Sequence, residues 1–458
     1  MTPAEVVASL RTAFDAGTTR PVRWRREQLI NLKRLLEEQG ERLARALHTD
    51  LGKSAIEAYT TELGISTSEV EHILKHLDEW LEPRRVKVPV SQKPGRAEVV
   101  PVPLGVALII SPWNYPVHLL ALPLAAAIAA GNAVVCKPSE LAPATSSELA
   151  ALLPQYLDTD AIAVIEGGPE VAQALLAERF DHIFFTGSTS IGRKVMAAAA
   201  EHLTPVTLEL GGKSPAIVDR SAHLPSAARR IALGRFMNAG QTCVAPDYVL
   251  VDQPVEDELT ALIADAVHDF YDGDPRTSGD FGRIVNEHHV ARLQRLLDAG
   301  GYESVVTGAV VDVADLYVAP TVLAGVSLDS EVMADEIFGP ILPIVGVGSV
   351  DEAIAIVNAR PSPLALYLFA DDDQVVEQVI ERTTSGGVCV NHTLFQLGVP
   401  DLPFGGVGPS GMGAYHGKAG FDAFSHHRSV FRKSSRPDPS IIYPPYGKWK
   451  KRVMRRAV

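Results

Sequence analysis

Hydrophobic residues recur every three or four positions through residues 23–80, where Leu29, Leu32 and Leu36 are separated by charged residues. A helix brings side chains at this spacing to one face, so the pattern predicts an amphipathic helical segment near the start of the fold. The longest apolar run, 117–130, is too short to span a bilayer. It predicts a buried helix, and the sequence predicts no transmembrane segment.

Apolar runs and helical patterns alternate through residues 104–210. Strands that alternate with helices form a parallel sheet wound on both faces, the architecture that binds dinucleotides. A second α/β region is expected over 211–390, so the predicted fold class is α/β with two doubly wound parallel-sheet domains. In the first region the expected strands are 105–110, 133–136, 162–165, 182–185 and one that ends at Glu209, and the expected helices are 117–130, 143–153, 170–177 and 190–200.

Two further segments fall outside these α/β regions. Residues 83–103 hold short β-type pieces at 86–88 and 98–100, separated by prolines, which predicts a hairpin. Glycine and polar residues predominate after residue 390, as expected of a loop that crosses back over a domain interface. The predicted organisation is a first domain of 1–82 and 104–210, a hairpin of 83–103 with part of 391–435, a second domain of 211–390, an interface-crossing segment of 391–435 and a basic tail of 436–458.

Composition and charge narrow the class of protein. A chain of 458 residues exceeds a single hydrophobic core, and 46% hydrophobic with 21% charged residues is typical of a globular enzyme. A formal net charge of −13 argues against nucleic acid as a partner, because phosphate binding relies on clustered Lys and Arg. Three cysteines and no signal-peptide pattern favour a reducing, cytoplasmic setting without disulfides. The 14 histidines show no spacing that predicts a metal site.

Cys243 and Glu209 are the strongest candidates for chemistry. No apolar pattern accounts for Cys243, whereas Cys136 and Cys389 lie inside apolar strands and are expected to be structural. A thiolate adds to a carbonyl and later leaves from the thioester, and a carboxylate can activate the water that hydrolyses it. Glu209 closes an apolar strand, where partial burial would raise its pKa towards that of a general base. The alternative is a strand-end carboxylate that pairs with Lys213.

Two signatures, Leu-Glu-Leu-Gly-Gly-Lys at 208–213 and Gly-Gln-Thr-Cys at 240–243, resemble those of the NAD(P)-dependent aldehyde dehydrogenase superfamily. The resemblance covers residues 1–435. The segments 410–418 and 421–426 are similar to the class 3 branch, whose members act on medium-chain, long-chain or aromatic aldehydes. Further motifs in the family's order are 111–116, 137–140, 185–188, 336–340 and 402–408.

The resemblance implies oxidation of an aldehyde to the carboxylic acid through a cysteine thiohemiacetal and thioester. Cys243 would attack the aldehyde, Asn114 and the Cys243 backbone N–H would hold the oxyanion, and Glu209 would activate water. From the residues alone, Asn114 could equally be a turn-forming residue. An apolar or aromatic substrate is favoured by the segments expected to line its pocket, which contain Tyr115, Met237, Thr242 and Phe395.

The turn that contains Gly187, Ser188 and Gly192 follows an expected strand and opens a helix, so its N–H groups could face a pyrophosphate. It departs from Gly-x-Gly-x-x-Gly, and the resemblance identifies it as the cofactor turn. A carboxylate at Glu140 favours NAD, with NADP also accepted. From the residues alone, this carboxylate could belong to a solvated helix start. The resemblance also assigns Lys137 to the ribose hydroxyls beside Glu140, Glu336 to the nicotinamide ribose and Phe338 to the nicotinamide ring.

The resemblance implies that the first domain binds NAD(P), the second is catalytic, and the hairpin joins subunits into a homo-oligomer, with a dimer favoured. The segment 448–456 is a basic cluster. One interpretation is a solvated or disordered terminus. The other is that the segment contacts a membrane surface weakly, which would make the protein membrane-peripheral. Two other functions stay open. One is a CoA-acylating aldehyde dehydrogenase, and the other is a membrane-recruited or binding protein on the same scaffold.

Overall fold

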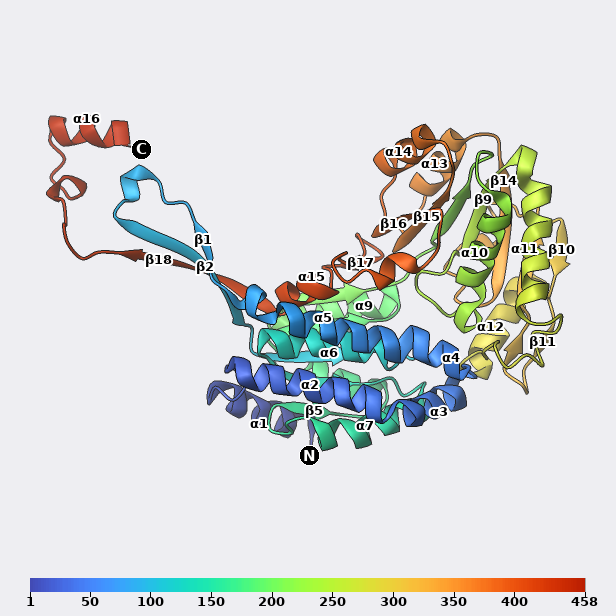
Figure 1. Cartoon of the computed structure of the whole chain (residues 1–458), viewed down its shortest axis with the longest axis horizontal. Helices are drawn as coiled ribbons and strands as arrows, with labels where there is room; N and C mark the ends of the chain where they lie inside the picture. The colour runs from blue at the N-terminus through green and yellow to red at the C-terminus, as the bar shows by residue number, and fades with distance from the viewer. Residues whose placement is uncertain (458) are drawn as a thin grey trace.

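The computed structural model describes residues 1–457 and begins with a layer of helices (Figure 1). Apolar faces of these helices pack on the first sheet, with Leu29, Leu36 and Ile73 fully or almost fully buried. The amphipathic helical segment predicted for 23–80 is therefore confirmed. The helices are α1 (Pro3–Asp15), α2 (Val22–Glu38), α3 (Gly40–Leu51), α4 (Ala55–Ala58), the π-helix η1 (Tyr59–Leu63) and α5 (Gly64–Leu81).

The first sheet has the order β17-β7-β6-β3-β4-β5, and all strands except β17 are parallel. One face packs against α2, α5 and α6, and the other against α1 and α9, so the predicted doubly wound, Rossmann-like sheet is confirmed. The strands are β3 (Val106–Ile110), β4 (Ala133–Lys137), β5 (Ile162–Val164), β6 (His182–Thr186), β7 (Val206–Glu209) and β17 (Gly411–Met412); the helices between them are α6 (His118–Ala130), α7 (Pro143–Tyr156), α8 (Pro169–Leu176) and α9 (Thr189–Glu201).

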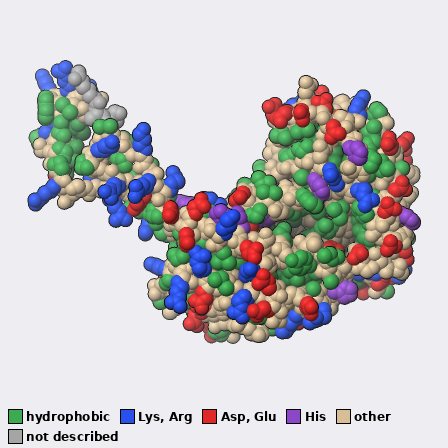
Figure 2. Space-filling view, in the orientation of Figure 1, with side chains coloured by type: hydrophobic (Ala, Val, Ile, Leu, Met, Phe, Trp, Pro, Cys, Tyr) green, Lys and Arg blue, Asp and Glu red, His purple; other side chains and the backbone are tan. Residues whose placement is uncertain are grey.

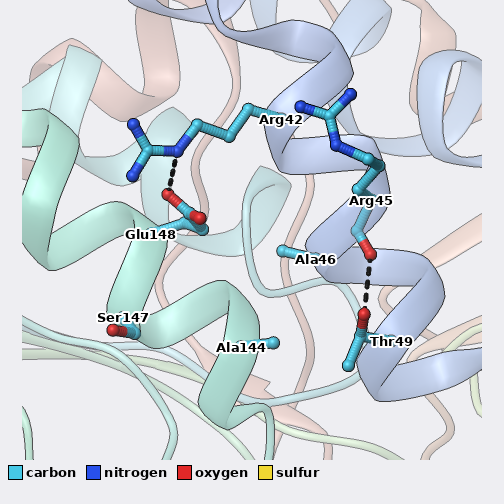
Figure 3. Close-up of a pocket in the computed structure, with 7 residues that line it drawn as sticks. All are labelled: Arg42, Arg45, Ala46, Thr49, Ala144, Ser147 and Glu148. Atoms are coloured by element: carbon cyan, nitrogen blue, oxygen red, sulfur yellow. Dashed lines mark hydrogen bonds and ion pairs between the residues drawn. The ribbon is translucent and has the colours of Figure 1, made fainter.

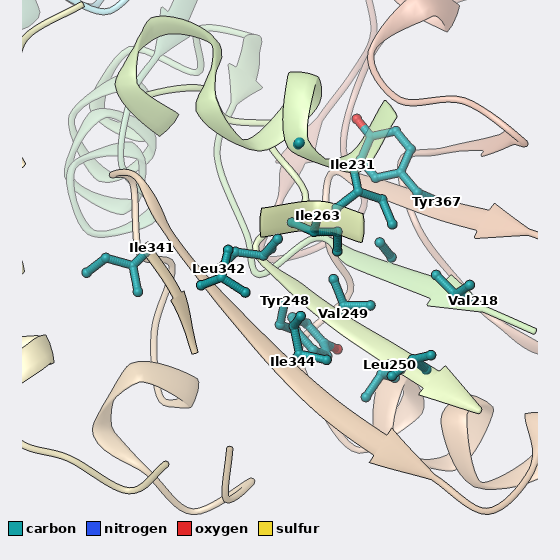
Figure 4. Close-up of a cluster of buried hydrophobic side chains, with 14 of the residues drawn as sticks. Val218, Ile231, Tyr248, Val249, Leu250, Ile263, Ile341, Leu342, Ile344 and Tyr367 are labelled. Carbon is teal, nitrogen blue, oxygen red and sulfur yellow. The ribbon is translucent and has the colours of Figure 1, made fainter. Parts of the chain in front are cut away.

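The second sheet has the order β10-β13-β14-β9-β8-β15-β16 and is parallel except for β10. Its core packs Val249 and Ile344 of the central strands against Ile231 and Ile263 of the covering helices (Figure 4). The strands are β8 (Pro215–Val218), β9 (Tyr248–Asp252), β10 (Ser304–Thr307), β13 (Thr321–Ala324), β14 (Ile341–Val347), β15 (Ala365–Phe369) and β16 (Gly387–Val390), with a small ribbon of β11 (Val311–Asp312) and β12 (Tyr317–Val318); the helices are α10 (Leu224–Phe236), α11 (Glu256–Phe270), α12 (Glu287–Asp298), α13 (Val350–Asn358) and α14 (Asp373–Arg382).

An arm formed by β1 (Arg84–Val86), β2 (Gly95–Pro103) and β18 (Ser425–Lys433) projects from the body (Figure 1). The first β-type piece was predicted at 86–88, two residues late, because pairing of Arg84 with Val99 on β2 sets the register. Lys and Arg side chains gather along this arm (Figure 2).

The segment 391–435 is more regular than a loop, because it contains β17, α15 (Gly417–Ala423) and β18. After leaving the second sheet, the chain returns to the first one, where β17 forms an edge strand beside β7. The tail then forms α16 (Lys448–Ala457), a mostly exposed helix that agrees with the expectation of a solvated terminus, and residue 458 lies outside the described residues. Among the described residues, no helix combines the length and the apolar character needed to cross a membrane.

Candidate active site

Glu209 lies at the carboxyl end of β7, where open α/β sheets place their sites. It pairs with Gly411 of β17 and is only 2% exposed. Neither carboxylate oxygen has a hydrogen-bond partner among the described residues, and burial raises the pKa of Glu209 well above its ordinary value. The alternative pairing with Lys213 is wrong, because that ammonium lies 2.7 Å from Asp247 instead.

A tight turn presents Cys243. Asn238, Ala239 and Gly240 have φ values of +53°, +51° and +74°, so three consecutive residues adopt left-handed backbone. A Cβ at Gly240 would lie 2.3 Å from the carbonyl oxygen of Gly339, so only glycine fits at this position. Strained backbone of this kind is maintained only where the surroundings fix it, as at many functional sites.

The surroundings of Cys243 favour the protonated form of its thiol. Burial, followed by the carboxylates of Glu336 and Glu209, raises its pKa well above the ordinary value. The sequence led us to expect a thiolate, but an acidic surrounding favours the protonated thiol. The proton must therefore leave Sγ when the thiol reacts.

The side chain of Asn114 faces the turn that presents Cys243. Asn114 is 3% exposed, and its Nδ2 donates to the carbonyl oxygen of Gln241 at 2.9 Å. The backbone carbonyl oxygen of Asn114 accepts from Lys53 Nζ at 2.9 Å and from Asn238 Nδ2 at 2.8 Å. These contacts join the turn after β3 to the turn before the thiol, which brings two sequence-predicted residues together.

Sequence reasoning missed Lys53, Glu62, Glu57 and Asn238. Lys53 and Glu62 are fully buried and form an ion pair of 2.5 Å, and the Asn238 N–H donates to Glu57 at 2.8 Å. In the sequence Lys53, Glu57 and Glu62 are ordinary polar positions of an amphipathic helical segment, and Asn238 is an ordinary polar residue of the turn before Cys243. The π-helix around Glu62 is a frequent mark of functional sites, but it has no simple sequence signature.

A cavity of about 420 Å³ includes Cys243 in its wall, and the wall is mainly apolar. Tyr115 and Thr242 form part of it, with their hydroxyl oxygens 2.6 Å apart. All four side chains predicted for the substrate pocket line this cavity: Tyr115, Met237, Thr242 and Phe395. Residues that the sequence did not indicate also line it, among them Leu119, Leu233, Phe404, Tyr415 and the buried His118 and His416.

The glycine turn after β6 is packed too tightly for a side chain at two of its positions. A Cβ at Gly187 would lie 2.6 Å from the ring of Phe185, and one at Gly192 would lie 2.6 Å from Leu210. Ser188 caps α9 by accepting from the N–H of the residue three positions on. The start of this 13-residue helix presents N–H groups and the positive end of its dipole, which suit a phosphate.

Lys137 and Glu140 form an ion pair of 2.8 Å at the end of β4. The ammonium is almost fully buried, whereas Glu140 is partly exposed. The pair therefore leaves an accessible carboxylate beside a cation that reduces its charge.

Glu336 and Phe338 lie on the segment before β14. Burial, followed by the charge of Asp247, raises the pKa of Glu336 to about 8, and its Oε1 has no hydrogen-bond partner among the described residues. Phe338 packs edge-on against Trp113, with ring centroids 5.4 Å apart. A half-buried carboxylate with one free oxygen fits a ligand hydroxyl, so the residues present fit a dinucleotide.

A second, polar cavity of about 460 Å³ lies between α3 and α7 (Figure 3). Arg42 and Arg45 line it, and the Arg42 guanidinium pairs with Glu148. The wall holds neither a thiol nor an unpaired carboxylate, so it lacks the groups for the chemistry at Cys243. No cluster of His, Cys, Asp or Glu in the described part of the chain could hold a metal ion.

Comparison with known proteins agrees with this geometry. The model of the aldehyde dehydrogenase family matches residues 3–430. Mouse aldehyde dehydrogenase family 3 member B2 is 48% identical over 98% of this chain and 94% of its own, and the mouse protein named aldehyde dehydrogenase, dimeric NADP-preferring, is 46% identical over 96% and 97%. A substrate-bound Staphylococcus aureus AldH structure superposes with a TM-score of 0.96 at 43% identity, covering 99% of this chain and 98% of that one.

The doubly wound first sheet, the thiol in the cavity wall and the unpaired carboxylate are together typical of an enzyme that binds a dinucleotide and reacts through a cysteine. The chain belongs to the aldehyde dehydrogenase family. The fold class, the resemblance and the enzyme class expected from the sequence are confirmed: this is an NAD(P)-dependent aldehyde dehydrogenase.

Proposed function

We propose that this enzyme oxidises apolar or aromatic aldehydes to carboxylic acids through covalent catalysis by Cys243. The observation that carries the proposal is the thiol in the wall of an apolar cavity, with the Asn114 amide bonded to the backbone two residues before it and the unpaired Glu209 carboxylate near enough to act on the thiol's charge. Aromatic and aliphatic side chains of the cavity favour an apolar substrate body.

The first step joins Sγ of Cys243 to the aldehyde carbon, the C=O π bond opens to the oxyanion, and the proton of the thiol passes to solvent water as the bond forms. Asn114 Nδ2 carries two N–H donors, one of which is used by Gln241. The second N–H and the backbone N–H of Cys243 stabilise the oxyanion. NAD(P)⁺, when bound, supplies the acceptor for the hydride that leaves the same carbon.

The second step hydrolyses the cysteine thioester. Both oxygens of Glu209 are free to accept, so the ionised carboxylate can remove a proton from water as it attacks the thioester carbon. The acid is released, and the thiol regains its proton. Because burial raises the pKa of Glu209, the carboxylate is a stronger base than an exposed glutamate.

The reaction is tested by following NAD(P)H and acid formation with and without CoA. We expect free acid in amounts equal to NAD(P)H, with no CoA consumed, because Glu209 activates water. A requirement for CoA, with a thioester of CoA as product, would favour the CoA-acylating alternative. A panel of aliphatic and aromatic aldehydes in the same assay defines the substrate class.

We assign the cofactor to the first domain, residues 1–82 and 104–210, and the thiol to the second, residues 211–390. Gly187, Ser188 and Gly192 would face the pyrophosphate, while Lys137 and Glu140 would bind the adenosine ribose. Glu336 would bind the nicotinamide ribose, with Phe338 beside the ring. The unpaired oxygen of Glu336 and the close packing at Gly187 support this assignment.

Glu140→Gln is expected to raise the relative efficiency with NADP. The Glu140 carboxylate repels a 2′-phosphate, and Lys137 weakens this repulsion without removing it. The measurement is kcat/KM for NAD and NADP in the parent and the variant. An unchanged ratio would place Glu140 away from the ribose, and Glu170→Gln on α8 serves as a control for removal of a surface charge.

The arm is proposed to join two copies of the chain. β1 is a short, exposed strand at one edge of the arm, and Val90 at its tip is 83% exposed. The related mouse protein is named dimeric, which supports a dimer.

The basic helix α16 is proposed to touch anionic membranes weakly, which would make a cytoplasmic enzyme membrane-peripheral. Trp449 is 68% exposed beside its Lys and Arg residues. Sedimentation with anionic vesicles should decrease as salt rises, because exposed charges are screened within about 8 Å at physiological ionic strength. Lys451→Glu with Arg452→Glu should abolish it, whereas Arg23→Glu with Lys75→Glu should not; salt-independent binding would contradict the proposal.

A further inference from the structure

Lys53 and Glu62 form a fully buried ion pair whose function the reaction above does not explain. Both side chains are 0% exposed, and Nζ lies 2.5 Å from Oε1. Taking two charges out of water costs several kcal/mol each, and apolar replacements are often equally stable. Stability is therefore a weak reason for such a pair at this place.

The two charges hold both ends of the segment that carries Asn114. Lys53 Nζ donates to the Asn114 carbonyl oxygen at 2.9 Å. Glu62 Oε2 accepts from the N–H groups of Val117 and His118 at 2.9 and 3.0 Å. The ammonium also lies 4.0 Å from the ring centroid of Tyr115, so the pair contacts almost every residue between Asn114 and the start of α6.

Orientation of the Asn114 side chain depends on this segment. Its Nδ2 reaches the Gln241 carbonyl across the site, two residues before the thiol. An oxyanion donor must be placed accurately, since a displacement of about 1 Å can cost on the order of 100-fold in rate. A turn has no helix or strand bonds to fix it, and the buried ion pair supplies that constraint.

We propose that Lys53 and Glu62 are positioning residues, which hold the Asn114 peptide so that its amide is aimed at the oxyanion of the reaction at Cys243. This inference rests on the proposed role of Asn114. The pair touches the carbonyl side of the Asn114 peptide, and neither Lys53 nor Glu62 lines the cavity, so of these three residues only Asn114 would contact the substrate. The rate of the attack by Cys243 on the aldehyde therefore depends on the charges of Lys53 and Glu62, although neither residue touches the substrate.

The test replaces both charges together with Lys53→Met and Glu62→Gln. This variant leaves neither member of the Lys53–Glu62 pair as a lone charge, and the side-chain amide introduced at position 62 keeps an oxygen for the N–H groups of Val117 and His118. The Asn114 carbonyl keeps its bond from Asn238. We expect a thermal midpoint close to that of the parent, a burst of NAD(P)H slowed by about 10- to 100-fold, and a nearly unchanged KM for the aldehyde. A parent-like burst in the folded variant would overturn the proposal.

Two comparisons separate positioning from a general structural effect. If the pair acts through Asn114, then adding Asn114→Ala to the double variant should slow the burst no further than Asn114→Ala alone. If the fold-losses of the double variant and of Asn114→Ala multiply in the combined variant, the proposal is overturned. Arg11→Met with Asp181→Asn removes another ion pair, at the opposite end of the sheet, and should leave the burst unchanged.

Failure of this inference is distinct from failure of the proposed function. Asn114→Ala with a parent-like burst would refute the oxyanion role itself, whereas a slow Asn114→Ala with a normal double variant would refute positioning alone. If the double variant does not fold, Lys53→Met alone carries the same test, because it removes the bond to the Asn114 carbonyl oxygen while burial, which raises the pKa of Glu62, favours the uncharged form of that carboxyl. A slow burst in that variant supports the proposal, and a parent-like burst overturns it.

Discussion

Cys243→Ala should abolish aldehyde oxidation, with a loss of about 10⁴-fold or more in kcat, because the covalent path cannot start without Sγ. The same change should remove any esterase activity, since ester hydrolysis would require acylation of the same sulfur. NAD(P)H formation and ester cleavage are measured on one preparation. Binding of the cofactor should persist, because the residues proposed to hold it are not altered.

Cys389→Ala is the matched control for this prediction. Cys389 is also a free, partly exposed thiol of the second sheet, but it lies within β16 and outside the wall of the cavity. We expect both activities to be retained in this variant. Turnover near the parent rate in Cys243→Ala, or loss in both variants, would refute the assignment of the nucleophile.

Local patterns were sufficient to predict the sheet that positions Glu209. The alternation of apolar runs and helices indicated its strands, and a carboxylate that ends a buried strand must emerge at the sheet's carboxyl edge. The four side chains predicted for the pocket also meet at one cavity with Cys243. These inferences succeed because each depends on the periodicity or on the end of one element.

Contacts between distant segments could not be predicted in this way. Lys53 reaches Asn114 across 61 positions, and β17 returns from beyond residue 410 to pair beside Glu209. Each of these polar or glycine residues also fits a solvated helix or a loop. Only the packed structure shows that the ammonium is buried and that the glycine strand closes the sheet.

Glu209→Gln should preserve the burst of NAD(P)H and slow steady turnover by about 100-fold or more, because acylation precedes the step that needs the base. In the parent, steady turnover should rise with pH as the raised pKa of Glu209 is crossed, since only the ionised carboxylate accepts a proton. That rise should be absent from the variant. Stopped-flow bursts and steady rates across pH measure both effects.

The raised pKa of Glu209 also predicts the stability of Glu209→Gln, which shows whether a loss of activity is due to misfolding. The folded enzyme raises the pKa of Glu209, so the folded state binds the proton more tightly than the unfolded chain does. Ionisation above the ordinary pKa of about 4.3 therefore destabilises the parent. The variant avoids this cost and should unfold at an equal or higher temperature at pH 8, with the advantage lost at pH 4. If the burst disappears from a variant of such stability, Glu209 must act earlier, by accepting the proton of Cys243 as the thiol attacks.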